Sequence, residues 1–476
     1  MKHLKKYSLL ILFLGLISCN EYLDVVPDQR LEIDNLDKLE ATLIGSYQNN
    51  RSYRFTHYSS DDVELAEEVF NSYPIIEDLF SWSRDFRNQR HQDSPSEFWL
   101  ASYGAISQAN LVLEKSTSIK TTNKEEEGRL KLIIAEAKLV RSYNHFMLVN
   151  IFAKHYDATS AKSDLGIPYT EKVEEKLITE YERISVEDVY NKAEKDLLDA
   201  ISVIEKYSNS FKNNRYRFTL ATMYAYASRF YNFRNKGTED QDKVILYATK
   251  SLDNFQGANN MRSWDEYTSD ANGPVNIERS DVGLVQSSYS WISINVNYQM
   301  TQNINNVLRA NPFGNTDFRL NINYSRDGNI FMPAFFFNFT SESGLLATDN
   351  FPLVEVILNK AEAHIRKDEF TQAADLLKIV GEKCYRGYNP NLLTSAFLKN
   401  FYGSSTDKGA WTSYLLHERR LSLMYKGFRW FDLKRYNIDI THKLEDGTEI
   451  KLSDIAPNRD YQIPKYAISN GMTPNN

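Results

Sequence analysis

The chain has 476 residues, with 63 acidic and 56 basic side chains and a formal net charge of −7. This acidic balance argues against nucleic acid as a partner, because a protein that binds phosphates needs a basic surface. Only two cysteines are present, so a large hydrophobic core must hold the fold. The 30 tyrosines, 26 phenylalanines and 6 tryptophans suit such a core, and they also suit a surface that stacks on flat ligands.

The first 18 residues have the pattern of a secretory signal. Three lysines in MKHLKKY precede the short apolar run SLLILFLGLI, which is too short for a membrane-spanning helix of about 20 residues. The junction LISC (16–19) resembles a bacterial lipobox, which implies cleavage before Cys19 and attachment of diacylglycerol to its sulfur. Two or more acyl chains would anchor the protein firmly. The alternative is an ordinary signal peptide cut nearby, with Cys19 incidental.

Helical periodicity begins after a polar tether. Residues 20–40 predict a tether that leads into a first helix over 36–47. Between 96 and 156, apolar residues recur at spacings of three and four, which predicts amphipathic helices. Trp99 lies on one of these apolar stripes, so we interpret it as a core residue, with a ligand platform as the alternative.

Further helices follow in pairs. Ser185, with Asp188 three residues later, is a predicted N-cap for the helix expected within 184–207. Another pair is expected over 219–233 and 240–255. With small residues at the crossings, such pairs look like tetratricopeptide hairpins, although the 34-residue period is not kept.

The character of the chain changes near residue 256. From there to 350 it is rich in Asn, Ser and Gly and predicts an irregular insertion with a strand or two. Long irregular segments of this kind are commonly functional. Helices resume at Pro352, with a break near 368–371, and a last long helix is expected through 411–437.

The predicted fold class is mainly α, with degenerate tetratricopeptide-like helix pairs, a large loop-rich insertion and a few short strands. Residues 19–476 are expected to form one globular unit. The predicted divisions are a signal peptide (1–18), an anchor, tether and first helix (19–50), an N-terminal helical region (51–255), the insertion (256–350) and a C-terminal region (351–476).

A motif near the C-terminus carries a family resemblance. The segment HERRLSLMYKGFRWFDLKRYN (417–437) resembles the C-terminal signature of the SusD/RagB outer-membrane lipoproteins of Bacteroidetes. Ser422 and Lys426 stand where that family commonly has acidic residues. The tail YQIPKYAISN, the AEA at 361–363 and the helix through Trp99 extend the likeness over most of the chain. The matching signature residues are Glu418, Arg419, Gly427, Arg429, Trp430, Asp432, Leu433 and Arg435.

The chemistry of this signature predicts a structural role. Acids and arginines beside Trp430 are best explained as partly buried ion pairs, with arginine planes stacked on rings. Gly427 is expected to end the helix. The alternative is a catalytic pair of Glu418 and Asp432, but neighbouring arginines would pair with both carboxylates, which makes a poor general acid.

Other motifs for catalysis or cofactors are missing from the sequence. It contains no dinucleotide-binding or P-loop motif, and HERRL lacks the second histidine of a zinc site. We therefore expect no cofactor and no metal. No pattern among the 63 acids excludes a pair of glycosidase carboxyls, and the family resemblance is what implies a binder without catalytic residues. The family resemblance implies a cell-surface protein, lipid-anchored in the outer membrane, that captures an oligosaccharide for a SusC-like TonB-dependent transporter. The alternatives are a RagB-like peptide binder, a lipid-anchored glycoside hydrolase and a purely structural surface protein.

Two segments outside the predicted helices offer the aromatic and polar side chains that sugar binding needs. The first is a predicted loop within 73–93, and the second lies within 287–299. The candidate ligand-binding residues are Trp82, Arg84, Asp85, Phe86, Asn88, Tyr289, Trp291 and Asn295.

Overall fold

The structure is a computed structural model, and part of the chain is described in it. The predicted lipid attachment at Cys19 and the candidate ligand residues Tyr289, Trp291 and Asn295 lie outside the described residues. Described are residues 32–48, 52–65, 74–91, 93–174, 180–264, 283–288, 298–299, 302–314, 316–321, 323–326, 330–333 and 346–475.

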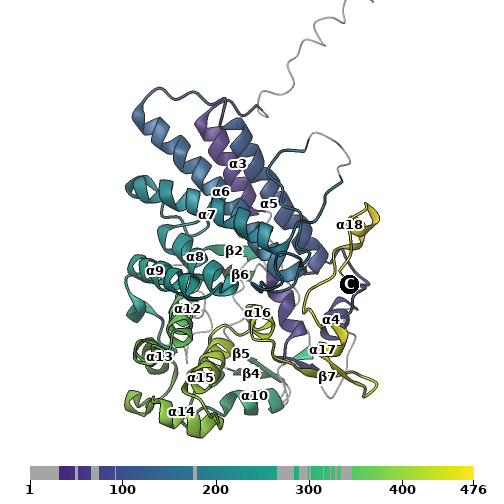
Figure 1. Ribbon diagram of the computed structural model, residues 1–476, viewed down its shortest axis with the longest axis vertical. Helices are drawn as coiled ribbons and strands as arrows, with labels where there is room; N and C mark the ends of the chain where they lie inside the picture. The colour runs from purple at the N-terminus through teal and green to yellow at the C-terminus, as the bar shows by residue number, and fades with distance from the viewer. Residues whose placement is uncertain are drawn as a thin grey trace, which may run out of the picture.

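Four long helices from the N-terminal half pack side by side at one end of the molecule (Figure 1). They are α3 (Leu36–Gln48), α5 (Pro95–Lys115), α6 (Lys124–Phe152) and α7 (Val186–Lys206). Side-chain caps fix where these helices start, because each satisfies a backbone N–H that has no partner within the helix. Ser185 accepts a hydrogen bond of 3.0 Å from the backbone N–H of Asp188, which confirms the predicted N-cap of α7.

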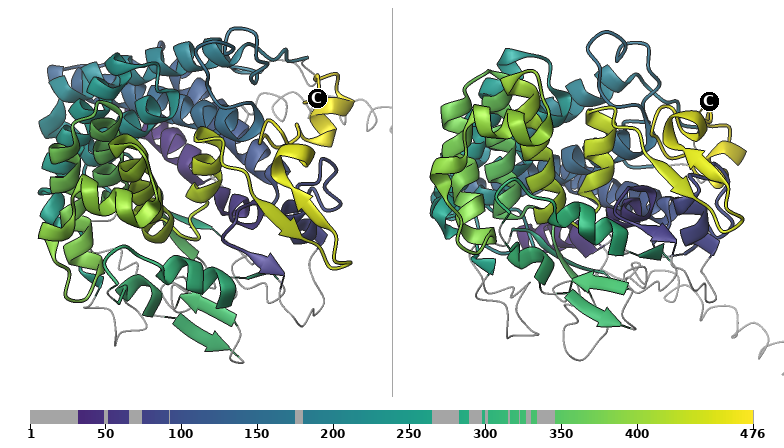
Figure 2. Two further views of the ribbon diagram at one scale, coloured as in Figure 1. Left: turned by 60° about the horizontal axis from the view of Figure 1, so that its bottom comes forward. Right: turned by 90° about the horizontal axis from the view of Figure 1, so that it is seen from below.

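The remaining long helices continue the stack as antiparallel pairs (Figures 1 and 2). Small buried residues such as Ala225 and Ala227 let neighbouring helices approach closely. The fold is mainly helical, as the sequence predicts. The pairs are α8 (Leu220–Arg234) with α9 (Thr238–Asn254), α12 (Leu353–Arg366) with α13 (Phe370–Cys384), and α14 (Ser395–Tyr402) with α15 (Asp407–Ser422).

Strands among the described residues are short and pair in twos, all antiparallel. They are β1 (Glu64–Leu65) with β3 (Tyr298–Gln299), β2 (Val285–Ser288) with β6 (Leu346–Asp349), β4 (Asn323–Arg326) with β5 (Ile330–Pro333), and β7 (Thr441–Lys443) with β8 (Glu449–Lys451).

Short helices connect these parts. They are α4 (Pro74–Phe80), α10 (Gln302–Arg309), α11 (Phe318–Asn321), α16 (Phe428–Arg435), α17 (Leu452–Ile455) and α18 (Lys465–Ser469), with 3-10 turns η2 (Tyr53–Ser59), η3 (Ser208–Ser210), η4 (Ala258–Asn260) and η8 (Pro390–Leu392).

The single last helix predicted over 411–437 is wrong, because the chain breaks between α15 and α16. Gly427 has a φ of +82° and is the N-cap of α16, so it begins a helix and does not end one. A Cβ at this position would lie 2.6 Å from the carbonyl oxygen of Tyr53, which leaves no room for any other residue.

The charged signature residues lie in α15 and α16, where Glu418, Arg419 and Asp432 are buried and Arg429 and Arg435 are partly buried. Arg435 also lies over the ring of Phe233, 5.0 Å from its centroid. The alternative of a catalytic Glu418–Asp432 pair loses support, because each acid accepts hydrogen bonds from an arginine inside the core. The ion pairs are Arg319–Glu418 (2.9 Å), Arg419–Asp432 (3.1 Å), Arg429–Asp61 (2.7 Å), Arg435–Asp432 (2.7 Å) and Arg435–Glu362 (2.6 Å).

Among the helices of the described ranges, none combines the length and the apolar character that crossing a bilayer requires.

Candidate functional site

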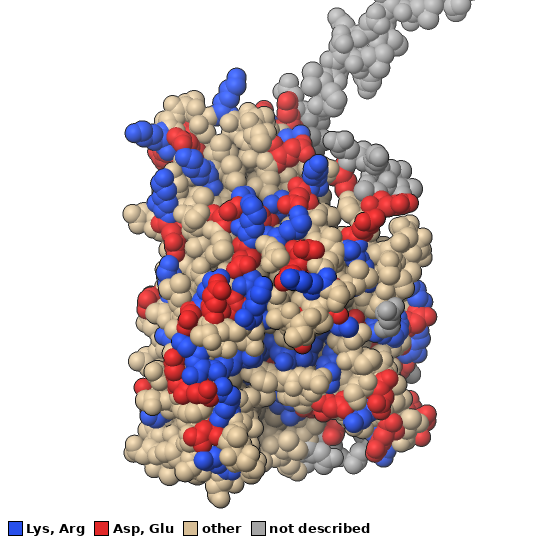
Figure 3. All heavy atoms as spheres, viewed as in Figure 1, with Lys and Arg blue, Asp and Glu red and all other residues tan. Residues whose placement is uncertain are grey.

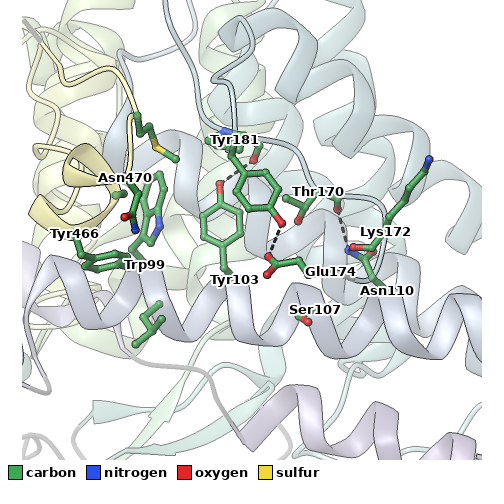
Figure 4. A pocket seen from close by; sticks show the side chains of 14 residues that line it. Trp99, Tyr103, Ser107, Asn110, Thr170, Lys172, Glu174, Tyr181, Tyr466 and Asn470 are labelled. Atoms are coloured by element: carbon green, nitrogen blue, oxygen red, sulfur yellow. Dashed lines mark hydrogen bonds between the residues drawn. The ribbon is translucent and has the colours of Figure 1, made fainter. Parts of the chain in front are cut away.

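A cavity of about 260 Å³ opens between α5, the segment that precedes α7, and the C-terminal tail (Figure 4). We define the loop wall as residues 165–174 and 180–184, and the tail as residues 461–475. The lining residues are Trp99, Leu100, Tyr103, Ser107, Asn110, Pro168, Thr170, Lys172, Glu174, Tyr181, Tyr466, Ala467, Asn470 and Met472.

The floor of the cavity is one face of α5. Trp99, Tyr103 and Ser107 follow one another at spacings of four residues, so the helical repeat brings them to the same side. Trp99 is a core residue, as predicted, with only 4% of its surface exposed, but it also lines the cavity. The core and ligand interpretations of Trp99 are therefore compatible.

Asn110 ties the floor to the loop wall. Its side-chain amide donates to the carbonyl oxygens of Thr170 (3.2 Å) and Lys172 (3.3 Å), and its carbonyl oxygen accepts from Arg141 (3.0 Å). Arg141 is fixed in turn by two hydrogen bonds to the carboxylate of Asp196 on α7. Because both ends of the amide are used within the protein, Asn110 positions the wall.

A buried histidine supports the loop wall from below. His145 stacks on Tyr169 at 3.7 Å between ring centroids. Its Nε2 lies 3.1 Å from the backbone N of Thr170 and its Nδ1 lies 2.9 Å from the carbonyl oxygen of Arg141. Burial lowers the pKa of His145 to about 3, so the ring is neutral at pH 7. The contacts then require the tautomer in which Nδ1 carries the proton and Nε2 accepts from Thr170.

The tail closes the opposite side. α18 begins directly after Pro464, and it brings Tyr466 and Ala467 to the cavity, with Asn470 and Met472 just beyond its end. Tyr466 is 40% exposed, so its ring stands at the rim of the cavity.

The lining combines four aromatic rings with a few polar groups. Trp99, Tyr103, Tyr181 and Tyr466 supply the rings, and the hydroxyl of Tyr181 donates to the carboxylate of Glu174. Flat rings beside amide, hydroxyl and carboxylate groups suit a ligand with apolar C–H faces and many hydroxyls. A second hollow continues from this cavity past Leu113 and Ile184, so the site is elongated along α5.

The candidate ligand loop predicted within 73–93 has a different role in the structure. Trp82 is 95% buried, donates to the carbonyl oxygen of Ser59 (2.9 Å) and stacks on His442 (4.3 Å between ring centroids). Phe86 is equally buried and stacks on Tyr461. Burial of both rings counts against a stacking surface at Trp82 and Phe86.

The polar candidates of that loop lie next to the tail. Arg84 pairs with Asp460 (3.0 Å), Asp85 pairs with Lys465, and Asn88 is exposed. Since Lys465 precedes Tyr466, this loop supports the tail from outside the cavity. The candidates Tyr289, Trp291 and Asn295 belong to the part of the chain that is not described.

Sequence reasoning missed Tyr181, Glu174, Tyr466 and Asn470 as lining residues. Their segments are irregular and polar, without periodicity, so only their position beside α5 reveals them. The available signal was the line of Trp99, Tyr103 and Asn110 on one helix, since a buried asparagine needs partners from another segment.

Acidification should destabilise the fold before its carboxylates titrate. Burial lowers the pKa of His57 to about 4 and of His145 to about 3, from an ordinary value near 6.5. The folded state therefore binds fewer protons than the unfolded state below pH 6.5, so stability falls as pH falls. We expect each histidine to remove about 1.5 kcal/mol between pH 6.5 and 5. Urea unfolding across this range measures the slope, which should decrease in His145→Gln; an unchanged slope would contradict the assignment.

Comparison with known families gives this fold and cavity a context. A family described as starch-binding and associating with the outer membrane matches residues 21–232. The SusD family matches residues 151–470. No curated protein sequence matches the chain.

Solved structures share the fold at low sequence identity. A SusD superfamily protein from Bacteroides thetaiotaomicron is 18% identical, with a TM-score of 0.71 over 93% of this chain and 100% of that chain. A SusD-like carbohydrate binding protein from Bacteroides vulgatus is 14% identical, with a TM-score of 0.67 over 92% and 97% of the two chains. A laminarin binding SusD-like protein is 16% identical, with a TM-score of 0.61 over 93% and 99%. Because the SusD family match spans more than half of its length, this chain belongs to the SusD family.

Proposed function

We propose that this protein is a non-catalytic, lipid-anchored surface protein that binds an oligosaccharide in the cavity between α5, the loop wall and the tail. The observation that carries the proposal is the set of four aromatic rings around the cavity, Trp99, Tyr103, Tyr181 and Tyr466. Sugars present apolar C–H faces that pack on such rings, and their hydroxyls pair with the polar groups between them.

The charge pattern favours a neutral ligand. The cavity lining holds one carboxylate, Glu174, and one cation, Lys172, among its described residues. On the face viewed in Figure 3, acidic and basic side chains are interspersed over the helices. A cavity lined by one positive and one negative side chain has no strong electrostatic preference for an anionic polysaccharide.

The proposed setting follows from the signal sequence and the family. Cys19 would carry the lipid, and the protein would deliver its ligand to a SusC-like TonB-dependent transporter in the outer membrane. A membrane-fractionation experiment on Cys19→Ala tests the anchor, because the variant should leave the membrane fraction.

Titration calorimetry of the whole chain tests the ligand class. The panel would hold starch, laminarin, a uronate polysaccharide and mixed peptides. We expect binding to a neutral polysaccharide, with a weaker response to the uronate chain. Binding to peptides alone would establish the RagB-like alternative. If no member of the panel binds, the proposal is rejected.

The same panel tests the alternative that this protein is a glycoside hydrolase. Hydrolysis of glycosidic bonds generally uses two carboxyl groups on either side of the bond. The described cavity lining offers Glu174 alone. We therefore expect no release of reducing ends from any bound polysaccharide; release that disappears in Glu174→Gln would overturn the binding-only proposal.

A further inference from the structure

We propose that Arg183 and Asn475 are positioning residues of the cavity, which hold the tail against the loop wall and so set the spacing of its two sides. With Gln462 they form what we call the tail latch. The expected effect on ligand binding rests on the proposed function. The latch itself is defined by hydrogen bonds within the protein.

Arg183 joins the two sides directly. Its Nε donates to the carbonyl oxygen of Gly166 (2.6 Å), which belongs to the loop wall. One terminal nitrogen donates to the carbonyl oxygen of Thr473 (2.9 Å), and the other donates to the side-chain oxygen of Asn475 (2.6 Å). The planar guanidinium thus spans from one segment to the other in a fixed geometry, which a flexible lysine ammonium does not reproduce.

Asn475 anchors the far end of the tail. Its side-chain amide donates to the carbonyl oxygen of Phe152, the last residue of α6, and to that of Tyr461. The side chain of Gln462 accepts from the backbone N–H of Asn475 (2.7 Å) and donates to its carbonyl oxygen (3.0 Å). The Asn475 side chain therefore donates to a carbonyl group at the end of α6 and accepts a hydrogen bond from Arg183 at the same time.

The segment between these anchors is the part of the tail that lines the cavity. Tyr466, Ala467, Asn470 and Met472 lie between Gln462 and Asn475 along the chain. A short segment fixed at both ends has little freedom, so its side chains keep their places beside Trp99 and Tyr181. Rings held in place lose less conformational entropy when a ligand binds.

The first variant is Arg183→Ala, with Arg129→Ala as its matched control. Arg129 likewise connects two segments through its side chain, in its case through ion pairs with Asp37 and Glu40, but near the start of α6. Hydrogen exchange of the ligand-free whole chain, followed by mass spectrometry, measures local opening. We expect faster exchange in residues 464–475 of Arg183→Ala, with α5 and α7 unchanged, and normal exchange of the tail in the control.

Binding is measured on the polysaccharide of the calorimetry panel that the wild type binds. We expect the Kd to rise about tenfold or more in Arg183→Ala, because the variant loses the hydrogen bonds by which the charged guanidinium holds the tail against the loop wall. Arg183→Lys should recover part of the affinity, and Asn475→Ala should act in the same direction as Arg183→Ala without removing a charge. The control should bind like the wild type.

The outcomes separate the latch from the proposed function. Unchanged exchange of the tail in both Arg183→Ala and Asn475→Ala would overturn the latch. Faster exchange with an unchanged Kd would show that the tail does not position the ligand. If the wild type binds nothing in the panel, the proposed function fails, and the exchange result alone decides whether Arg183 holds the two sides together.

Discussion

Replacing Glu362 by glutamine should lower the free energy of unfolding by about 3–5 kcal/mol, the usual result of breaking a buried ion pair. Glu362 is fully buried and receives hydrogen bonds from Arg435 (2.6 and 3.0 Å), Arg366 (2.7 Å) and Tyr436 (2.8 Å). Burial alone would raise its pKa, but the surrounding arginines hold the pKa well below its ordinary range. The glutamine variant keeps the shape of the side chain and removes the charge, leaving Asp432 as the remaining anion beside Arg435 and Arg419.

Chemical denaturation of Glu362→Gln and of an exposed control measures this loss. Glu127→Gln is the matched control, because Glu127 pairs with Lys131 on the surface of α6, where such pairs contribute little to stability. A loss below 1 kcal/mol in Glu362→Gln would show that the core adapts to the missing charge. In that case the charges of Arg366, Arg419 and Arg435 would not need Glu362 to balance them.

Removing the rings at the rim of the cavity should weaken ligand binding by about tenfold for each ring, or about 1.5 kcal/mol. Tyr466→Ala removes the exposed ring on the tail, and Tyr181→Ala removes the ring on the loop wall. Both residues lie on the surface of the cavity and not in the central core, so we expect little change in the midpoint of thermal unfolding.

The matched control is Tyr216→Ala, which also removes a half-exposed tyrosine but does not line the cavity. Calorimetry with the polysaccharide that the wild type binds should give the control an unchanged Kd. Equal affinity of Tyr466→Ala, Tyr181→Ala and the wild type would place the ligand elsewhere. The residues not described by the structure, including Tyr289 and Trp291, would then become the next candidates.

Much of the local structure could be predicted because its causes are local. A helix depends on apolar residues every three or four positions and on a cap within a few residues of its start, and both are visible in the sequence. Ser185 capping α7 is an example, as is the break between α12 and α13. The break between α15 and α16 was missed, because the close contact of Gly427 with Tyr53 joins residues more than 370 positions apart in the sequence.

The candidate site was harder to predict for the same reason. Trp82 stands in a polar, irregular segment that suggests exposure, yet His442 comes from the C-terminal hairpin to cover its ring. Conversely, Trp99 stands on a clear apolar stripe that suggests burial, yet it lines a cavity. Exposure depends on which distant segment packs over a residue, and a single sequence does not contain that information.

By itself, the sequence determined the helical fold class, the SusD/RagB likeness and the presence of charged residues that need partners, since each depends on spacing and composition within one segment. Only the tertiary structure decided where those partners are and where a cavity forms. Asn110, Tyr181 and Tyr466 come together from three separate parts of the chain. They meet because burying large helical faces and satisfying buried polar groups outweigh the entropy lost in bringing distant segments together.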